Sequence, residues 1–153
     1  MVSPFLGYRL SPEEVENPGI TMDDTLQLVD ALVEKKLDYL HVSTRDFGSL
    51  RDENDKESRA VIIQERVGNR IPIIGVGSIH TPDEAVNVLR SGIPLVALGC
   101  QLLIDGIWIN KVKEGKEHEI REKLPKNNDD EYSIPDGLWQ VLMARKGWLP
   151  MEE

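Results

Sequence analysis

Apolar residues along this chain gather in short continuous runs that are separated by stretches with helical spacing. The runs lie at residues 5–10, 38–43, 71–76 and 95–98. Short apolar runs rich in β-branched residues are typical of strands in a parallel sheet that is buried on both faces. The spacing of one helical face occurs at residues 22–33, 60–67 and 82–91. The pattern therefore predicts four strands that alternate with three helices.

Two of the predicted helices begin with a capping box. Thr21 precedes Asp24 by three residues, and Thr81 precedes Glu84 in the same way, with Pro82 at the first helical position. A Thr hydroxyl and a carboxylate three residues later satisfy each other's backbone N–H groups, so these helices should start at 22 and 82. The helix from 82 should carry Ala85, Val86 and Leu89 on one face.

Glycines follow the last two predicted strands. Gly77 comes directly after the strand that ends at Val76, and Gly99 comes after the next strand and before a short helix. In eight-stranded α/β barrels a recurrent phosphate site lies in the loops after the seventh and eighth strands, beside a short extra helix. These glycines therefore favour phosphate binding, although they are equally expected in tight strand-to-helix turns.

Length and composition limit the fold and the partners. The chain has 153 residues, of which 40% are hydrophobic, and a net charge of −9. This is enough for one domain with a core, but well short of the roughly 250 residues of a full barrel. The acidic balance argues against nucleic acid and anionic membranes as partners, and no apolar run reaches the length of a membrane span. We therefore expect a soluble cytoplasmic protein, built as a half-barrel or as a small open sheet.

The C-terminal third is more polar than the rest of the chain. A helix is predicted at 107–112, followed by a charged, solvated connector at 114–130. The tail at 135–150 holds apolar residues that favour a final helix docked on the body. We therefore predict two parts, a half-barrel with phosphate loops at 1–113 and a charged connector with a docking tail at 114–153. Trp108, Trp139 and Trp148 are interpreted as packing anchors.

Several segments together resemble a known family. They are GYRLSPEE at 7–14, DYLHVS at 38–43, IPIIGVGSI at 71–79, LVALG at 95–99 and IPDGLW near the end. In this order they resemble the C-terminal half of the Old Yellow Enzyme family, the FMN-dependent NADH:flavin oxidoreductases. The resemblance implies an α/β fold that is the C-terminal half of a (β/α)8 TIM barrel, with about four parallel strands and a C-terminal helical tail.

The resemblance also implies which residues bind the cofactor. Arg9 matches the arginine that points at N1 and the C2 oxygen of the flavin, where a guanidinium stabilises the negative charge of the reduced ring. The alternative is an Arg9 that pairs with Glu13 or Glu14 at the surface. Gly77 and Ser78, and then Gly99 and Cys100, match the two loops that bind the FMN phosphate.

Cys100 departs from the family pattern, which usually has arginine at this position. Losing that charge-assisted contact would cost about 1.5 to 3 kcal/mol, or roughly ten- to hundredfold in FMN affinity. FMN binding is therefore expected to be weakened or lost. The thiol itself is interpreted as buried and inert, with a reactive cysteine at a helix N-terminus as the alternative.

The activity implied by the resemblance is hydride transfer from NAD(P)H through FMN to an acceptor such as an activated alkene. The matching half lacks the family's substrate-binding and proton-donating side chains, so we expect a separate N-terminal half-barrel chain as partner and assign no catalytic residue here. The alternatives are an inactive truncated remnant, an interaction module, or a half-barrel that binds another phosphorylated ligand. Unpaired sheet edges favour a homodimer or aggregation. His41 is interpreted as a satisfied core histidine, and the acidic residues 46, 52, 53 and 55 as a solvated face rather than a metal site.

Overall fold

The structure is a computed structural model that describes residues 5–50, 56–128 and 134–152. The chain divides into two compact units, Met1–Ala97 and Leu98–Glu153. We call them the sheet unit and the C-terminal unit and describe each by itself. The predicted division after residue 113 stays a prediction. The boundary between the two observed units lies between Ala97 and Leu98, just after the fourth strand.

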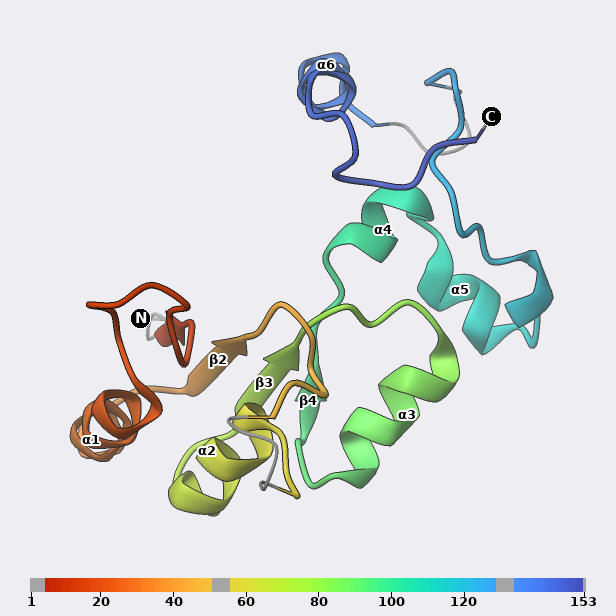
Figure 1. The fold of residues 1–153 in the computed structure, drawn as a ribbon. Coiled ribbons are helices and arrows are strands. Elements are labelled where there is room, and N and C mark those ends of the chain that lie inside the picture. Colours follow the sequence, from red (N-terminus) through yellow and green to blue (C-terminus); the bar gives the residue numbers. More distant parts are fainter. Residues whose placement is uncertain (1–4, 51–55, 129–133, 153) are drawn as a thin grey trace. The chain divides into compact units, whose positions relative to one another are not determined.

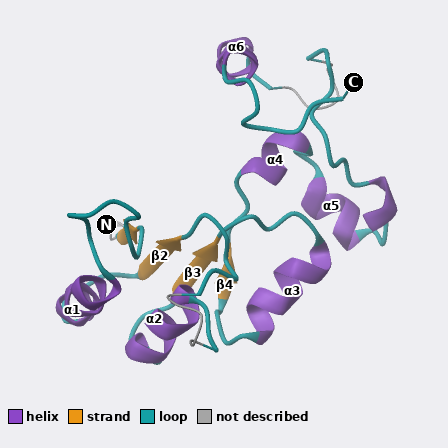
Figure 2. Ribbon diagram, in the orientation of Figure 1, coloured by secondary structure: helices purple, strands orange, loops and turns teal. Residues whose placement is uncertain are grey.

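The sheet unit has the predicted alternation of strands and helices (Figures 1 and 2). Its elements are β1 (Gly7–Leu10), α1 (Met22–Val33), β2 (Tyr39–Ser43), α2 (Arg59–Val67), β3 (Ile73–Val76), α3 (Pro82–Arg90) and β4 (Leu95–Val96). The four strands are parallel and lie in the order β1-β2-β3-β4. In Figure 1 the three helices follow one another around one side of the strands. This α/β unit has half of the eight strands of a TIM barrel, as predicted.

The two faces of the sheet differ in burial. Leu40, Val42 and Ile73 are fully buried, together with Val29 of α1 and Ile63 of α2. Because side chains alternate between the faces of a strand, these residues mark the face that the helices cover. The opposite face holds a row in register across three strands, which consists of Arg9, His41 and Ile74.

The predicted caps are present at both helices. The Thr21 hydroxyl accepts a hydrogen bond from the backbone N–H of Asp24, and Thr81 does the same for Glu84, while each carboxylate accepts from the backbone N–H of its threonine. Hydrogen bonds from the backbone N–H groups of His80 and Thr81 lower the pKa of Glu84, because they stabilise the ionised carboxylate. Local sequence therefore fixes where α1 and α3 begin.

The apolar face predicted for α3 is buried only in part. Val88 is the buried residue of this helix, whereas Val86 and Leu89 are exposed and Ala85 is half-buried. The four residues form one apolar stripe along the helix. The stripe is buried at Val88 and becomes exposed farther around the helix, at Leu89 and Val86. Amphipathic spacing identified the stripe, but only its first part has a neighbouring element in this unit.

The C-terminal unit is helical. It contains α4 (Cys100–Ile104), α5 (Trp108–Lys113), the short 3-10 helix η1 (Glu117–Glu119) and α6 (Asp136–Ala144). Its apolar core consists of Ile104, Leu124, Ile134, Leu142 and Leu149. The predicted terminal helix therefore exists and packs through Leu142 into a core that it shares with α4.

The prediction of a solvated connector at 114–130 is wrong at one point. Leu124 is only 1% exposed, and its backbone N–H donates to the carbonyl of Pro150 at 2.8 Å. This contact ties the middle of the connector to the end of the chain. Among the predicted packing anchors, Trp108 is buried and Trp139 packs against the core, but Trp148 is 44% exposed and its ring stacks with the Arg145 guanidinium.

Candidate functional site

Arg9 is held at the edge of the sheet where the parallel strands end. Its Nη2 donates a hydrogen bond to the Ser43 hydroxyl at 2.9 Å. Arg9 is the penultimate residue of β1, and Ser43 is the last residue of the neighbouring strand β2. The guanidinium is exposed and has a defined direction, at the edge of a parallel α/β sheet where ligands generally bind.

The alternative of a surface ion pair for Arg9 does not fit the described residues. Glu13 accepts a hydrogen bond from Arg59 Nε at 2.7 Å and forms an ion pair with that side chain. The Glu14 carboxylate accepts from the backbone N–H of Ile20 at 2.9 Å. Both predicted carboxylate partners are therefore used by other groups.

The loop between β2 and α2 folds onto the end of β3. The Thr44 hydroxyl donates to the carbonyl of Val76 at 2.9 Å, and the backbone N–H of Phe47 donates to the carbonyl of Gly77 at 3.1 Å. The Ser78 hydroxyl donates to the carbonyl of Arg45 at 2.8 Å. These hydrogen bonds connect the carboxyl ends of β2 and β3, and the bond from Arg9 to Ser43 connects β1 to β2.

Gly77 and Ser78 have different roles in this arrangement. A Cβ at Gly77 would lie 2.5 Å from both the Phe47 nitrogen and Thr44 Oγ1, so the missing side chain makes room for the loop. Ser78 is exposed and has a φ of 44°, a left-handed conformation that is uncommon for a residue other than glycine. Because the loop occupies the space beside Gly77, Ser78 is the part of this turn that faces outward. A role for either residue in phosphate binding stays a prediction.

A cavity of about 470 Å³ opens beside this edge. It is lined by the end of β2 and the start of α2, with Ser43 and Arg59, and by the loops after β1 and β2, with Glu13, Glu14, Thr44, Arg45 and Ser49. Sequence reasoning missed Ser43, Thr44 and Arg45. The available signal was their position at, or directly after, the end of a predicted strand. The cavity places hydroxyl and guanidinium groups next to the Arg9–Ser43 pair.

His41 was predicted to be a core histidine whose ring nitrogens have hydrogen-bond partners, and the structure differs from this prediction. Its Nε2 is buried and has no hydrogen-bond partner among the described residues. Burial lowers the pKa of His41, and the charge of Arg9, its register partner on β1, lowers it further. The imidazole is therefore neutral near pH 7 and leaves Arg9 as the charged group of this row.

Gly99 and Cys100 begin the C-terminal unit. Gly99 is exposed, and a Cβ there would meet nothing within 4 Å. Cys100 is the first residue of α4, half-buried, and packs against the core cluster around Ile104 and Leu124. Its side chain is therefore a packing group, but it is half-buried and not buried as predicted, and its chemical inertness stays a prediction.

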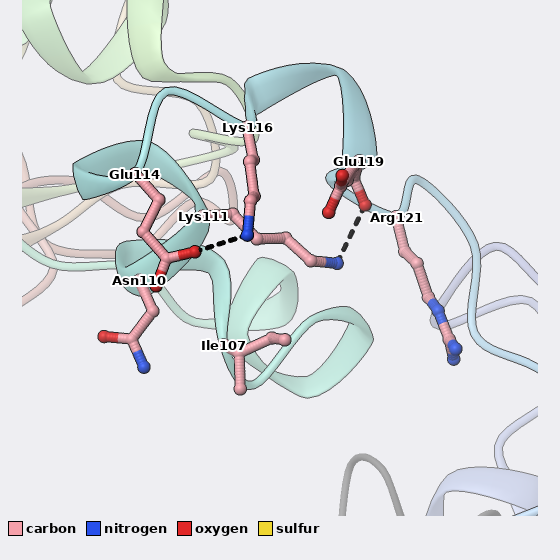
Figure 3. Close-up of a pocket in the computed structure, with 7 residues that line it drawn as sticks. All are labelled: Ile107, Asn110, Lys111, Glu114, Lys116, Glu119 and Arg121. Carbon is pink, nitrogen blue, oxygen red and sulfur yellow. Dashed lines mark hydrogen bonds and ion pairs between the residues drawn. The ribbon is translucent and has the colours of Figure 1, made fainter.

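A second cavity, of about 420 Å³, lies within the C-terminal unit (Figure 3). Its charged groups already have partners inside the protein. Lys111 Nζ donates to the buried Asp105 carboxylate at 2.7 Å and to the carbonyl of Glu119 at 2.8 Å, and Lys116 pairs with Glu114 at 2.7 Å. We therefore take the cavity of the sheet unit, with its exposed Arg45 and with Arg9 bonded to its lining residue Ser43, as the candidate site.

The remaining candidates for chemistry are peripheral. His80 and His118 are exposed, and His118 Nε2 lies 3.8 Å from a Glu119 carboxylate oxygen. Within the described ranges, groups of three or more residues suited to hold a metal ion are absent. Of the acidic loop residues, 52, 53 and 55 lie outside the described part of the chain. A search of the described helices found none that is long and apolar enough to cross a membrane.

Comparison with known proteins gives a consistent result. Residues 2–119 match the model of a family described as "NADH:flavin oxidoreductase / NADH oxidase family". The chain is 47% identical over 151 residues to a "Probable NADH-dependent flavin oxidoreductase YqiG" of Bacillus subtilis, covering 97% of this chain and 41% of that protein. It is 33% identical to an "NADH:acrylate oxidoreductase" of Vibrio harveyi and 31% identical to an "NADH:fumarate oxidoreductase" of Klebsiella pneumoniae.

These two alignments cover 90% and 92% of this chain, but only 14% and 16% of the respective relatives. The chain thus spans less than half the length of each of the three relatives.

Proposed function

Since the chain belongs to the NADH:flavin oxidoreductase / NADH oxidase family, we propose that it is the FMN-binding part of an NADH-dependent oxidoreductase. The observation that supports this proposal most strongly is the exposed Arg9 guanidinium, which the Ser43 hydroxyl directs beside a cavity at the carboxyl edge of the sheet. When bound, FMN would accept a hydride from NAD(P)H and pass it to an acceptor.

The residues present fit such a cofactor. Arg9 would hold the edge of the flavin that becomes negative on reduction, because a guanidinium is a fixed positive charge with several N–H donors. His41 would stay neutral beside it, so that Arg9 alone sets the local charge. For the phosphate, Ser78 is exposed at the end of β3. Gly99 and Cys100 belong to the other unit, and their part in phosphate binding rests on the resemblance alone. Gly77 would contribute indirectly, because it lets the loop pack against the turn that carries Ser78.

We further propose an activated alkene as the acceptor. Two relatives are named for acrylate and fumarate, both of which contain an alkene conjugated to a carboxyl group. The candidate cavity offers Arg45 and neighbouring hydroxyl groups to a carboxyl group of the acceptor. Of the two glutamates that also line it, Glu13 is paired with Arg59. The proton and the remaining substrate contacts would come from a chain that supplies the rest of a barrel.

A second candidate function rests on Cys100. A thiol packed against the apolar cluster leaves only the backbone N–H of this residue for a phosphate, where the family usually has arginine. This favours a remnant that keeps the fold and has lost FMN binding and redox activity, or that serves as an interaction module. A half-barrel that binds a different phosphorylated ligand is the third alternative.

A titration of free FMN with the purified chain, followed by quenching of flavin fluorescence, separates these functions. We expect saturable binding that weakens by about ten- to hundredfold in Arg9→Ala and tightens by a similar factor in Cys100→Arg, as for a charge-assisted hydrogen bond. Arg90→Ala is the matched control, because this exposed arginine lies at the last turn of α3.

Each other outcome contradicts part of the proposal. Binding that appears only in Cys100→Arg would identify a remnant. Binding that Arg9→Ala and Arg90→Ala weaken equally would remove Arg9 from the site. If neither the parent chain nor Cys100→Arg quenches FMN, the flavin proposal fails, and a thermal-shift screen with inorganic phosphate and sugar phosphates then tests the third alternative.

A further inference from the structure

The sheet has two outer strands whose outer edges are unpaired within the described residues. There β1 pairs with β2 alone and β4 pairs with β3 alone, so the sheet is open at both sides. The backbone N–H and C=O groups of an open edge are a template for another strand, and natural proteins usually cover or charge such edges. Both edges of this sheet instead have apolar surroundings.

At the first edge, Phe5 and Leu6 lead into β1 and are 77% and 55% exposed, and Tyr8 on the strand is 40% exposed. Helix α1 adds Leu28, which is 39% exposed and precedes the fully buried Val29 by one residue. We call these four residues the β1 flank. They carry no charge, although the chain as a whole is strongly acidic.

At the opposite edge, Leu95 of β4 is 47% exposed, and α3 adds the exposed Val86 and Leu89. We call these three residues the β4 flank. Val86 and Leu89 belong to the apolar face predicted for α3, and both are exposed. Large exposed apolar groups that cluster next to an open edge indicate an interaction surface.

Helix geometry directs the two flanks outward. Crossovers between parallel strands are right-handed, so each helix lies between its two strands and runs antiparallel to them. One residue turns a helix by about 100°, so Leu89, one residue after the buried Val88, lies on the side of α3 toward β4. Leu28, one residue before the buried Val29, lies on the opposite side of α1, toward β1.

The two flanks therefore face opposite directions and differ in composition, so that one can contact the other on a second molecule. When one patch of a molecule binds a different patch of the next molecule, further copies can add and form a filament, unless the rotation between copies closes a ring. Here the strands number four and are all parallel. A two-fold axis along the strand direction would place β4 of each copy beside β1 of the other and give eight parallel strands, the number of a closed α/β barrel.

We propose that this chain associates with a second copy of itself through these flanks. Each β4 flank contacts the β1 flank of the other copy, which covers both open edges and the exposed stripes of α1 and α3. The row of Arg9, His41 and Ile74 then lines the interior of the closed sheet. This inference concerns assembly and is independent of whether FMN binds. A second copy and a foreign half-barrel would occupy the same edges, so the dimer takes the place of the separate N-terminal half-barrel chain.

Mass measurement by light scattering after gel filtration, from 2 to 200 µM chain, is the first test. We expect twice the mass of one chain over the upper part of this range. Added salt should favour the dimer, because it screens the repulsion between two acidic chains and strengthens apolar contacts. A monomer at 200 µM, or a series of larger species that grows with concentration, would overturn the closed dimer.

Two variants test how the flanks pair. One carries Leu89→Lys and Leu95→Lys on the β4 flank, and the other carries Leu6→Lys and Leu28→Lys on the β1 flank. Each should be monomeric, with its dissociation constant raised at least about a hundredfold for the loss of two apolar contacts. Val141→Lys is the matched control, because Val141 is equally exposed but lies on α6 of the C-terminal unit.

Mixing the two variants is the decisive measurement. Each keeps the flank that the other has lost, so one intact contact can form, and we expect a 1:1 complex from two monomeric proteins. If either variant alone remains a dimer, like flanks pair with each other and the proposal is wrong. It is equally wrong if two folded variants, checked by circular dichroism, do not associate on mixing. In that case a foreign half-barrel becomes the better candidate for the flanks.

Discussion

Lys111 Nζ lies 2.7 Å from Asp105 Oδ2 in the interior of the C-terminal unit, where the Asp105 side chain is fully buried. The same carboxylate oxygen accepts a hydrogen bond from the backbone N–H of Arg121 at 2.9 Å, and Lys111 also donates to the carbonyl of Glu119. The pair thus joins α5 to the connector that follows it. This buried ion pair therefore links two segments of the C-terminal unit from the inside.

Removing one member of this pair should be costly, because it leaves the other charge buried without a partner. We expect Lys111→Met to lower the free energy of unfolding by about 3 to 5 kcal/mol. Chemical denaturation measured by circular dichroism gives this value. Lys116→Met is the control, because its pair with Glu114 has the same 2.7 Å distance but is exposed. Adding Asp105→Asn to Lys111→Met should restore part of the loss, and equal effects of Lys111→Met and Lys116→Met would contradict this role.

Gly77 should not tolerate a side chain. A Cβ would approach the Phe47 nitrogen and Thr44 Oγ1 to 2.5 Å, so Gly77→Ala must displace the loop after β2. We expect a loss of about 1 to 3 kcal/mol of stability, typical of overpacking. Gly99→Ala is the matched control, because its Cβ would lie in open space. Thermal unfolding of the two variants tests the difference, and a neutral Gly77→Ala would show that the loop is not held there.

The N-cap of α3 should contribute measurably to stability. Thr81→Ala removes the hydroxyl that accepts from the backbone N–H of Glu84, and we expect a loss of about 1 kcal/mol. Thr81→Ser keeps the acceptor oxygen and should retain most of the stability. Denaturant midpoints of the three proteins provide the comparison. If serine were as damaging as alanine, packing of the threonine methyl group and not capping would be responsible.

His41 should make the protein less stable in mild acid. Its pKa in the folded protein lies below the ordinary value of 6.5. As the pH falls below 6.5, the unfolded chain binds a proton that the folded imidazole does not yet bind, so the free energy of unfolding decreases until the pH passes the folded pKa. His41→Leu should remove this part of the pH dependence. A pH dependence of His41→Leu equal to that of the parent chain would contradict this role of His41.

The parts of this structure that sequence predicted are those that depend on near neighbours in the chain. Thr21 and Thr81 cap their helices through residues three positions away, and the parallel strands follow from apolar runs that any neighbour can bury. Arg9 was identified because it lies at the end of a strand and matches a family motif. These inferences needed no knowledge of register or of the path of a loop.

Other features depend on register and on distant segments. The Ser43 hydroxyl meets Arg9 only because β1 and β2 pair with a particular register, and Gly77 faces Phe47 only because the loop folds back. A helical pattern shows that Leu89 is on the apolar side of α3, but not whether another element covers it. The sequence pattern did not single out Asp105 and Lys111, because it does not show that the connector closes over them.

Every strand of the sheet pairs only with the strands that come just before and just after it in the sequence. The pair Arg9 and His41 forms first along the chain, then His41 and Ile74, then Ile74 and Leu95. Because domains form from the N-terminus during synthesis, each new strand reaches an edge that is already in place as soon as its crossover helix has left the ribosome. The sheet unit can therefore be assembled in the order in which it is translated.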